Sequence, residues 1–331
     1  MQVYKKKPLT FYHVCAIVWF ALGEISLGWF FDSGIRESFY FFKCFVRGGG
    51  FSLTNTFSGR FGMCGLTGMI FGEFHRSDSD YKRLCEIFTE AFYLSEERGY
   101  HASGVSTLSL DGRHFLHKSP IPPSVMVTRD IYNEVLSGIC DNTTILMGHS
   151  RWKTVGTELD NANNQPIVAG PIIGTHNGTI KNHNILFKSF QFKRFAEVDS
   201  EVLFRMAESS LQEGIIQTSC FNKFLSYCIG SLSFVFVSKT DPKNVYLYHG
   251  DKPLFLYYNR DLQVLFYSSS DRYIESSILG SAGWEPLYFP ENKMYQTNYS
   301  DFTHIISESF FYQRGCRNTT QLMLPYFKKV V

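Results

Sequence analysis

A cysteine at the head of an apolar run is the feature of this sequence that most restricts its fold. Cys64 directly follows Met63, and the stretch 64–72 is rich in apolar residues. Such a run predicts a buried strand that holds its first residue rigidly. In most proteins a cysteine in this setting is simply a small buried hydrophobe. We weigh that interpretation against a second one, in which translation starts at Met63, the methionine is removed and Cys64 becomes the first residue.

A terminal cysteine brings two reactive groups together. Its thiol is a strong nucleophile once it is deprotonated, and its α-amino group, with an unperturbed pKa of about 8, can accept the thiol proton. Thiolate chemistry at neutral pH then requires no histidine partner. The small residue Gly65 leaves room for a substrate beside the sulfur. The second interpretation of Cys64 therefore predicts a nucleophile.

The first 62 residues differ from the rest of the sequence. A largely apolar run, 11–31, follows a lysine cluster and resembles a signal or membrane anchor, but Glu24 interrupts it. The stretch 48–62 is rich in Gly, Ser, Thr and Asn and is typical of a linker. Three explanations of this segment compete: a translation artefact upstream of a start at Met63, a propeptide that is cleaved off, and a genuine anchor. We favour the first, and only the first two leave Cys64 with a free amine.

Composition excludes several classes of function. The formal net charge of +2 over 331 residues predicts no nucleic-acid partner. The eight cysteines form no CxxC pair and no zinc-type spacing with histidine, so we expect no metal site. Scattered cysteines are typical of a reduced protein, and we expect a cytoplasmic location.

The predicted elements indicate an α+β protein, because strands come first, helices lie in the middle and strands return. We expect strands at 64–72, 103–110, 113–117, 145–152, 172–176, 231–237, 245–248, 254–258, 264–267, 284–289 and 293–297. We expect helices at 81–97, 131–137, 199–211, 222–229 and 270–279. Residues 301–331 are less patterned and are expected to form a surface tail.

Three polar positions near strand or helix ends have complementary chemistry. Arg151 can clamp a carboxylate with two parallel hydrogen bonds. The side chain of Asn177 and the amide of Gly178 can form an oxyanion hole. Asp199 can bind an ammonium group. Together with Cys64 these groups describe a site that cleaves the side-chain amide of a free α-amino acid.

Each of these positions also has a simpler interpretation. Asp199 is suited to cap the following helix. Asn177-Gly178 is a common turn dipeptide. Arg151 is acceptable as an ordinary surface arginine. Only the combination favours the catalytic hypothesis.

The motifs resemble those of class II glutamine amidotransferases, which are N-terminal-nucleophile hydrolases. They appear in the order found in that family, most like the glutaminase domain of glucosamine-6-phosphate synthase: Cys64-Gly65, Arg98-Gly99-Tyr100, 148–152, 176–180 with Asn182-His183, and 199–202. The segments 250–254 and 267–271 also look like later strands of that domain. The resemblance covers residues 64 to about 300.

The resemblance implies a four-layer αββα sandwich and hydrolysis of glutamine to glutamate and ammonia, without metal or cofactor. By match, the nucleophile is Cys64 with its own α-amine as base, the oxyanion donors are Asn177 and Gly178, the glutamine carboxylate is bound by Arg151 and Thr154, and the ammonium is bound by Asp199. We expect Arg98, Trp152 and His176 to support these groups.

Three features depart from the family pattern. His101 stands where the synthase family usually has Asp, and Val155 stands where it usually has His. These departures affect the loop contacts and the choice of relative. The segment before Cys64 is more serious, because an attached segment turns the amine into a peptide nitrogen.

We therefore expect an extension at 1–63, an amidotransferase domain at 64–300 and a tail at 301–331. About 30 residues after position 300 are too few for a synthetase domain. The expected function is a stand-alone glutaminase that passes ammonia to a separate acceptor or synthetase partner. The alternative is a non-catalytic glutamine-binding or regulatory module on the same fold, tethered to a membrane if 11–31 is retained. A weaker third option is another amide hydrolase of the superfamily, which Arg151 and Asp199 together disfavour.

Overall fold

The computed structural model describes residues 17–21, 24–29, 40–47, 50–53 and 63–315, with side chains described from residue 63 onward. The chain divides into two units, 1–61 and 62–331. In the first unit four strands form an antiparallel sheet in the order β1 (Ile17–Ala21), β2 (Glu24–Trp29), β3 (Tyr40–Arg47) and β4 (Gly50–Leu53). Much of the candidate anchor 11–31 lies outside the described residues. None of the helices in the described part of the chain is long and apolar enough to cross a membrane.

The second unit contains two seven-stranded sheets. We call the first the β10 sheet, and its order is β19-β18-β14-β13-β10-β9, with β20 parallel beside β13. Its strands are β9 (Ile167–Ala169), β10 (Ile172–Ile180), β13 (Ile229–Ser238), β14 (Asp241–His249), β18 (Lys293–Asn298), β19 (Ile306–Ser309) and β20 (Gln313–Arg314). We call the second the β5 sheet, and its order is β17-β15-β16-β5-β8-β6-β7. Its strands are β5 (Gly65–Phe71), β6 (Ala102–Ser109), β7 (His114–Ser119), β8 (Thr143–Arg151), β15 (Phe255–Asn259), β16 (Val264–Ser268) and β17 (Trp284–Leu287).

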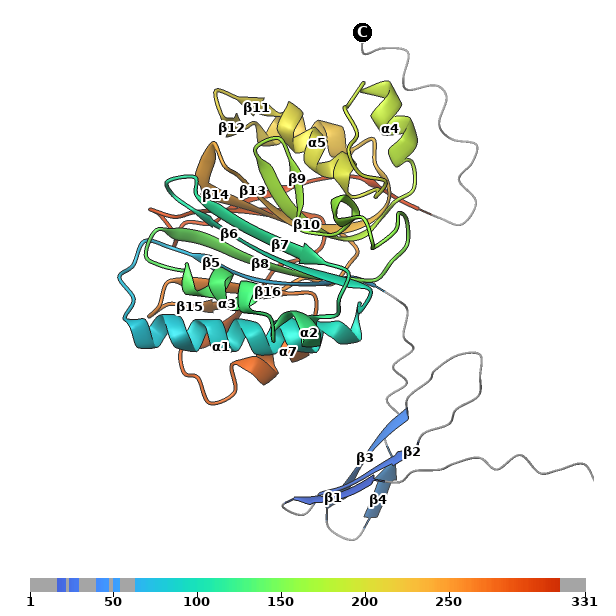
Figure 1. Ribbon diagram of the computed structural model, residues 1–331, viewed down its shortest axis with the longest axis vertical. Helices are drawn as coiled ribbons and strands as arrows, with labels where there is room; N and C mark the ends of the chain where they lie inside the picture. Colours follow the sequence, from blue (N-terminus) through green and yellow to red (C-terminus); the bar gives the residue numbers. More distant parts are fainter. Residues whose placement is uncertain (1–16, 22–23, 30–39, 48–49, 54–62, 316–331) are drawn as a thin grey trace, which may run out of the picture. The chain divides into compact units, whose positions relative to one another are not determined.

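Helices cover the outer face of each sheet (Figure 1). The β5 sheet is covered by α1 (Asp78–Leu94), α2 (Pro123–Met126), α3 (Asp130–Ser137) and α7 (Asp271–Ser277). The β10 sheet is covered by α4 (His183–Ser189), α5 (Glu201–Ser209) and α6 (Thr218–Leu225). Two 3-10 turns, Ser95–Glu97 and Asn161–Asn163, and the short pair β11 (Leu211–Gln212) and β12 (Ile215–Ile216) complete the unit. The arrangement is the αββα sandwich, so the α+β prediction and its four layers are confirmed.

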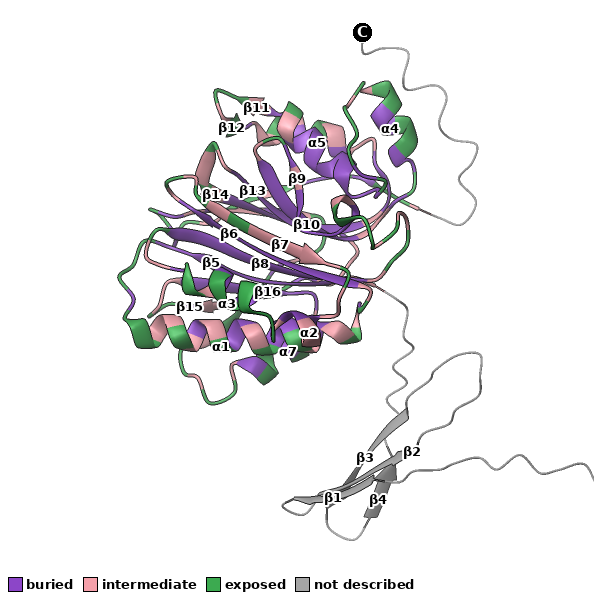
Figure 2. Cartoon of the chain, in the orientation of Figure 1, coloured by how far each residue is buried: buried purple, intermediate pink, exposed green. Residues whose placement is uncertain are grey.

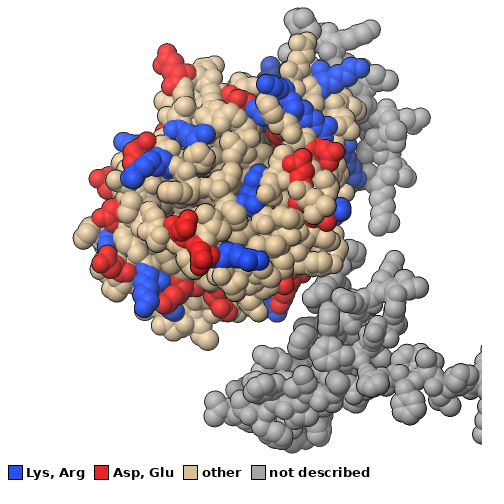
Figure 3. Space-filling view, viewed as in Figure 1, with Lys and Arg blue, Asp and Glu red and all other residues tan. Residues whose placement is uncertain are grey.

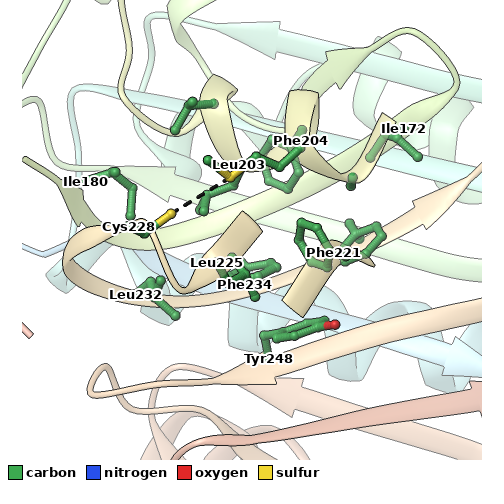
Figure 4. Close-up of a cluster of buried hydrophobic side chains, with 14 of the residues drawn as sticks. Ile172, Ile180, Leu203, Phe204, Phe221, Leu225, Cys228, Leu232, Phe234 and Tyr248 are labelled. Atoms are coloured by element: carbon green, nitrogen blue, oxygen red, sulfur yellow. Dashed lines mark hydrogen bonds between the residues drawn. The ribbon is translucent and has the colours of Figure 1, made fainter. Parts of the chain in front are cut away.

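Three apolar cores separate the four layers, and the strands and inward helix faces are buried (Figure 2). Figure 4 shows part of the core under α5 and α6, where Phe221 and Leu225 meet Phe234 of β13 and Tyr248 of β14. The strands alternate between cores as the two-residue period requires. In β5, for example, Leu66 and Ile70 face the space between the sheets, while Met69 and Phe71 face the helices.

One structural difference from the sequence-based elements affects the site. β10 does not end at His176 but continues through Asn177-Gly178 to Ile180, paired with β13 along its whole length. The turn interpretation of Asn177-Gly178 is therefore wrong, because the pairing with Ser233 and Leu232 keeps both residues in the sheet.

The sequence also placed some helix and tail boundaries incorrectly. α6 ends at Leu225, and Ile229 opens β13 instead of closing a helix. Within the stretch expected to form a surface tail, β19 and β20 extend the β10 sheet and Phe310 and Tyr312 are buried. Charged side chains of both signs are distributed over the face shown in Figure 3, in line with the net charge of +2.

Candidate active site

The alternation of the strands directs three candidate residues into the space between the two sheets. Cys64, just before β5, has the same parity as Leu66 and Ile70, which face that space. Arg151, the last residue of β8, has the parity of Met147, and Asn177 of β10 has the parity of Ile173, both in the same core. Strand alternation thus directs a thiol, a cation and an amide toward the space between the two sheets.

The Cys64 thiol lies against the end of β8. Its Sγ donates to the carbonyl oxygen of Trp152, at a distance of 3.7 Å. The carbonyl oxygen of Cys64 accepts from Nε of Arg98 at 3.0 Å, and this contact holds the start of β5 in place. Burial raises the pKa of the Cys64 thiol to about 11, while the charges of Arg151 and Arg98 act in the opposite direction. The thiol is therefore protonated at neutral pH when Met63 is attached.

Gly65 is required by the packing beside the nucleophile. A Cβ at this position would lie 2.3 Å from Oγ of Ser150 and 3.0 Å from Cβ of Ser95. Ser150 Oγ itself donates to the carbonyl oxygen of Ser95 at 2.7 Å. The absence of a side chain at Gly65 thus allows the start of β5 to pack tightly on β8.

Asn177 is buried with its amide unpaired. Neither Oδ1 nor Nδ2 has a hydrogen-bond partner among the residues that the structure describes. An unpaired buried amide costs on the order of 1–3 kcal/mol, so the fold retains it at a free-energy penalty. The next residue, Gly178, has φ +142° and packs so closely on β13 that a Cβ would lie 2.1 Å from the carbonyl oxygen of Ser231. The pair therefore supplies a preorganised donor on backbone that has no room for a side chain.

Arg151 is a buried cation held by its own loop. Its NH1 donates to Oδ1 of Asn164 at 2.8 Å, and its NH2 donates to the carbonyl oxygens of Val155 at 2.7 Å and Gly156 at 2.9 Å. A guanidinium has five N–H donors, so these three acceptors fix its plane. Burial lowers the pKa of Arg151, yet an arginine stays charged in proteins. Thr154, expected to help bind the carboxylate, lies exposed in the bend that follows.

Asp199 is buried at the end of β10. Its Oδ2 accepts from the backbone N–H of Ile180 at 2.6 Å. Burial raises the pKa of Asp199 to about 6, against the hydrogen bonds from backbone amides and the charge of Arg151, which lower it. The simpler interpretation of Asp199 as a helix cap is wrong, because α5 begins after Ser200 and the carboxylate bonds to β10 instead. The carboxylate charge also reaches the Cys64 thiol, whose pKa it raises.

His176 is directed away from the space between the sheets. Its Nδ1 shares a hydrogen bond with Oγ of Ser200 at 2.9 Å, and burial lowers its pKa to about 4. A neutral imidazole on the helix side of β10 positions this strand and is unsuited to deprotonate the thiol of Cys64. Trp152 supplies the thiol's acceptor, and Arg98 holds the Cys64 carbonyl.

Several supporting residues were not identified from the sequence. Gln165 bridges to both backbone groups of His176, at 2.6 Å to N and 3.0 Å to O. Glu201 accepts from the amides of Phe195 and Ala196 and thereby fixes the loop before Asp199. The polar run 161–165 was the only signal for Gln165. Glu201 lies within the motif 199–202, but nothing in that motif indicated its bonds to the amides of Phe195 and Ala196.

The chain is similar to known proteins in sequence and in fold. The glutamine amidotransferase domain family matches residues 149–275. A 7-cyano-7-deazaguanine synthase of Sulfolobus acidocaldarius is 27% identical over 66% of this chain and 45% of its own length. A glutamine–fructose-6-phosphate aminotransferase (isomerizing) of Geobacillus kaustophilus is 26% identical over 58% of this chain and 30% of its own. The solved glutamine phosphoribosylpyrophosphate amidotransferase from B. subtilis matches with a TM-score of 0.55 and 19% identity, over 75% of this chain and 49% of that one. The chain thus spans less than half the length of each of these relatives.

Proposed function

This chain contains a class II glutamine amidotransferase domain, and from that premise we propose that it hydrolyses L-glutamine to glutamate and ammonia through a thioester on Cys64. The observation that carries the proposal is that Arg151 and Asp199 lie close enough to Cys64 for their charges to act on the pKa of its thiol. Strand alternation directs Asn177 toward the same space between the sheets. A nucleophile, a carboxylate clamp, an oxyanion donor and an ammonium acceptor are the groups that this reaction needs.

In the proposed reaction the Cys64 thiolate attacks the side-chain amide carbon of glutamine. Nδ2 of Asn177 and the N–H of Gly178 donate to the oxyanion, and ammonia leaves with the proton that the α-amine took from the thiol. Water then hydrolyses the thioester and releases glutamate. Arg151, with Thr154, binds the substrate carboxylate and Asp199 binds its ammonium. The base exists only in a chain that begins at Cys64.

The proposal includes a stand-alone role. The chain acts as a glutaminase whose ammonia passes to a separate acceptor or synthetase protein, in a reducing compartment such as the cytoplasm. The names of the relatives describe two different products, those of a 7-cyano-7-deazaguanine synthase and of a glutamine–fructose-6-phosphate aminotransferase. Their similarity to this chain therefore does not indicate which acceptor receives the ammonia.

The test compares glutamate release by the natively processed protein with that of Cys64→Ala. We expect the variant to lose all detectable hydrolysis, because no other group replaces the thiol. The matched control is Cys85→Ala, since Cys85 is a half-buried cysteine on α1 whose Sγ donates to the carbonyl oxygen of Leu136. Full activity in Cys64→Ala rules out the mechanism. Intact mass of the same sample locates the N-terminus.

The second candidate is a non-catalytic glutamine-binding module. It is favoured by one observation, that the Cys64 thiol has a pKa of about 11 when Met63 precedes it. Calorimetric binding of glutamine without turnover by a protein that retains Met63 supports this alternative. Membrane fractionation of that protein tests whether segment 11–31 tethers it.

A further inference from the structure

His101 lies where it can hold the loop that carries the substrate clamp. It follows the Arg98-Gly99 turn and precedes β6, which pairs with β8 from Ala102 opposite Arg151. The backbone N–H of His101 donates to the carbonyl oxygen of Arg151 at 3.1 Å. Its ring Nδ1 accepts from the backbone N–H of Lys153 at 3.3 Å. The two bonds hold the chain on either side of Trp152.

Aromatic packing fixes the orientation of the His101 ring. The ring stacks on Tyr100 with centroids 4.5 Å apart and meets the edge of Trp152 at 5.1 Å. Tyr100 and Trp152 also contact each other edge to face, at 5.5 Å. Such aromatic pairs stabilise by about 0.5–1.5 kcal/mol each beyond burial. These ring contacts stabilise the orientation in which the imidazole presents Nδ1 to the N–H of Lys153.

The segment held by His101 contacts both halves of the proposed site. The carbonyl oxygen of Trp152 is the acceptor for the Cys64 thiol. The carbonyl oxygens of Val155 and Gly156, farther along the same loop, fix the guanidinium of Arg151. A shift of Trp152–Lys153 thus displaces the thiol's acceptor and the carboxylate clamp together.

On the premise of the proposed function, we propose that His101 is a positioning residue for glutamine, and that its unprotonated Nδ1 holds the loop 152–156 in the substrate-binding conformation. His101 does not touch the substrate in this proposal. It acts through the Lys153 amide, and through the Trp152 and Val155 backbone, on Cys64 and Arg151.

The proposal has a pH signature because an Nδ1 that carries a proton cannot accept a hydrogen bond. Burial is the main cause of a lowered pKa for His101, which keeps the ring neutral near pH 7. The charged groups that face the ring are Lys153 and Arg151, which lower its pKa, and Glu158, which raises it. Lys153 and Glu158 also pair with each other at 2.7 Å. Protonation at acid pH is therefore expected to release the loop.

The experiment compares His101→Phe and His101→Asn in the natively processed, glutamine-hydrolysing protein. Phe keeps the ring stack and removes the acceptor, so we expect KM for glutamine to rise about tenfold at pH 8, the equivalent of one hydrogen bond, with kcat within about twofold. Asn places an amide oxygen near the position of Nδ1 and should restore KM at pH 8. The matched control is His117→Phe, at a half-buried position on β7 opposite Val105, which should leave KM unchanged.

The pH profile separates positioning from mere structural support. Asp199 is present in both proteins, so dividing the wild-type KM by the His101→Asn KM at each pH removes its contribution. This ratio should rise as pH falls from 8 to 5. A flat ratio, or a His101→Phe protein with wild-type KM, overturns the inference. If His101→Phe fails to fold, the ratio with His101→Asn alone decides. A wild-type protein without glutamine hydrolysis contradicts the proposed function instead, which is a distinct result.

Discussion

In the proposed function, Asp199 is a residue adapted to binding at the expense of stability. Its carboxyl is buried, and its pKa of about 6 lies above the ordinary value of 3.8. The folded state therefore binds the proton more tightly than the unfolded state, and this group's contribution to stability decreases as pH rises from about 4 to about 6. At pH 7 the penalty is on the order of 3 kcal/mol. A substrate ammonium that pairs with the carboxylate removes that penalty.

Asp199→Asn is expected to weaken glutamine binding without destabilising the fold. We expect KM to rise by about 100-fold, since a buried charge partner is lost, and the melting temperature at pH 7 to stay level or rise. In the wild type, KM should increase as pH falls through about 6, the pKa of Asp199; in the variant this dependence should disappear. Steady-state kinetics over pH 5–8 and thermal unfolding measure both.

The control for that variant is Asp261→Asn, at an exposed position in the turn between β15 and β16. It should change neither KM nor its pH profile. If Asp199→Asn lowers the melting temperature and leaves KM unaltered, Asp199 is a structural residue.

The residues predicted from the sequence are those whose chemistry is local to a motif. Cys64, Arg151 and Asp199 stood out because the chemistry of a thiol, a guanidinium and a carboxylate can be recognised from the residue type alone. Gln165 and Glu201 did not, because their roles are hydrogen bonds to backbone atoms of distant loops and strands. The position of Asn177 is set by the pairing of β10 with β13. The register of that pairing is not visible in the residues next to Asn177 along the chain.

At the scale of elements, strand β10 contains Gly178, a residue that the frequency of Asn-Gly in turns would assign to a turn. Asn-Gly is a common dipeptide of hairpin turns, because glycine readily adopts positive φ. Gly178 does have a positive φ, +142°, but within a strand. The strand continues because Gly178 permits backbone contact with Ser231 at a distance that a Cβ would block. Helix α1 was predicted more accurately. Its apolar residues repeat every three or four positions. Its start, set by the capping box of Ser77 and Asp80, was placed three residues late, and its end at Leu94 is followed by the 3-10 turn Ser95–Glu97.

Gly178→Ala is expected to destabilise the protein by about 3 kcal/mol, from unfavourable φ together with the clash against β13. The matched control is Gly280→Ala, because Gly280 also has positive φ, +76°, but a Cβ there meets nothing within 4 Å. The control should lose only about 1 kcal/mol. Urea unfolding midpoints compare the two variants, and equal losses would show that β13 does not restrict Gly178.

At the scale of the whole molecule, Cys64 lies at the start of the second unit. Apolar periods in the sequence indicated an α+β protein, and the four layers were expected from the family resemblance. In the structure the central strands, such as β5 and β13, divide their residues between two of the three cores. The pairing of β5 between β16 and β8 is not readable in the sequence, because both partners are distant along the chain: Thr67 of β5 pairs with Ser268 of β16, and Gly65 pairs with Ser150 of β8. That central pairing is what fixes Cys64 beside Arg98 and Trp152.

A chain that begins at Cys64 should fold as stably as the full chain and react faster. Residues 62–331 form a unit of their own, so removal of 1–63 is expected to shift the melting temperature of this unit by no more than about 3 °C. The free α-amine, with a pKa of about 8, provides a base that the peptide nitrogen of the longer chain lacks. With Met63 attached, the thiol pKa is about 11, so little thiolate exists at pH 7.5. We therefore expect iodoacetamide to alkylate Cys64 at least tenfold faster in the shorter chain, as followed by peptide mass. Equal alkylation rates would show that the amine does not activate the thiol, and a large loss of melting temperature would show that the first 63 residues belong to the folded unit.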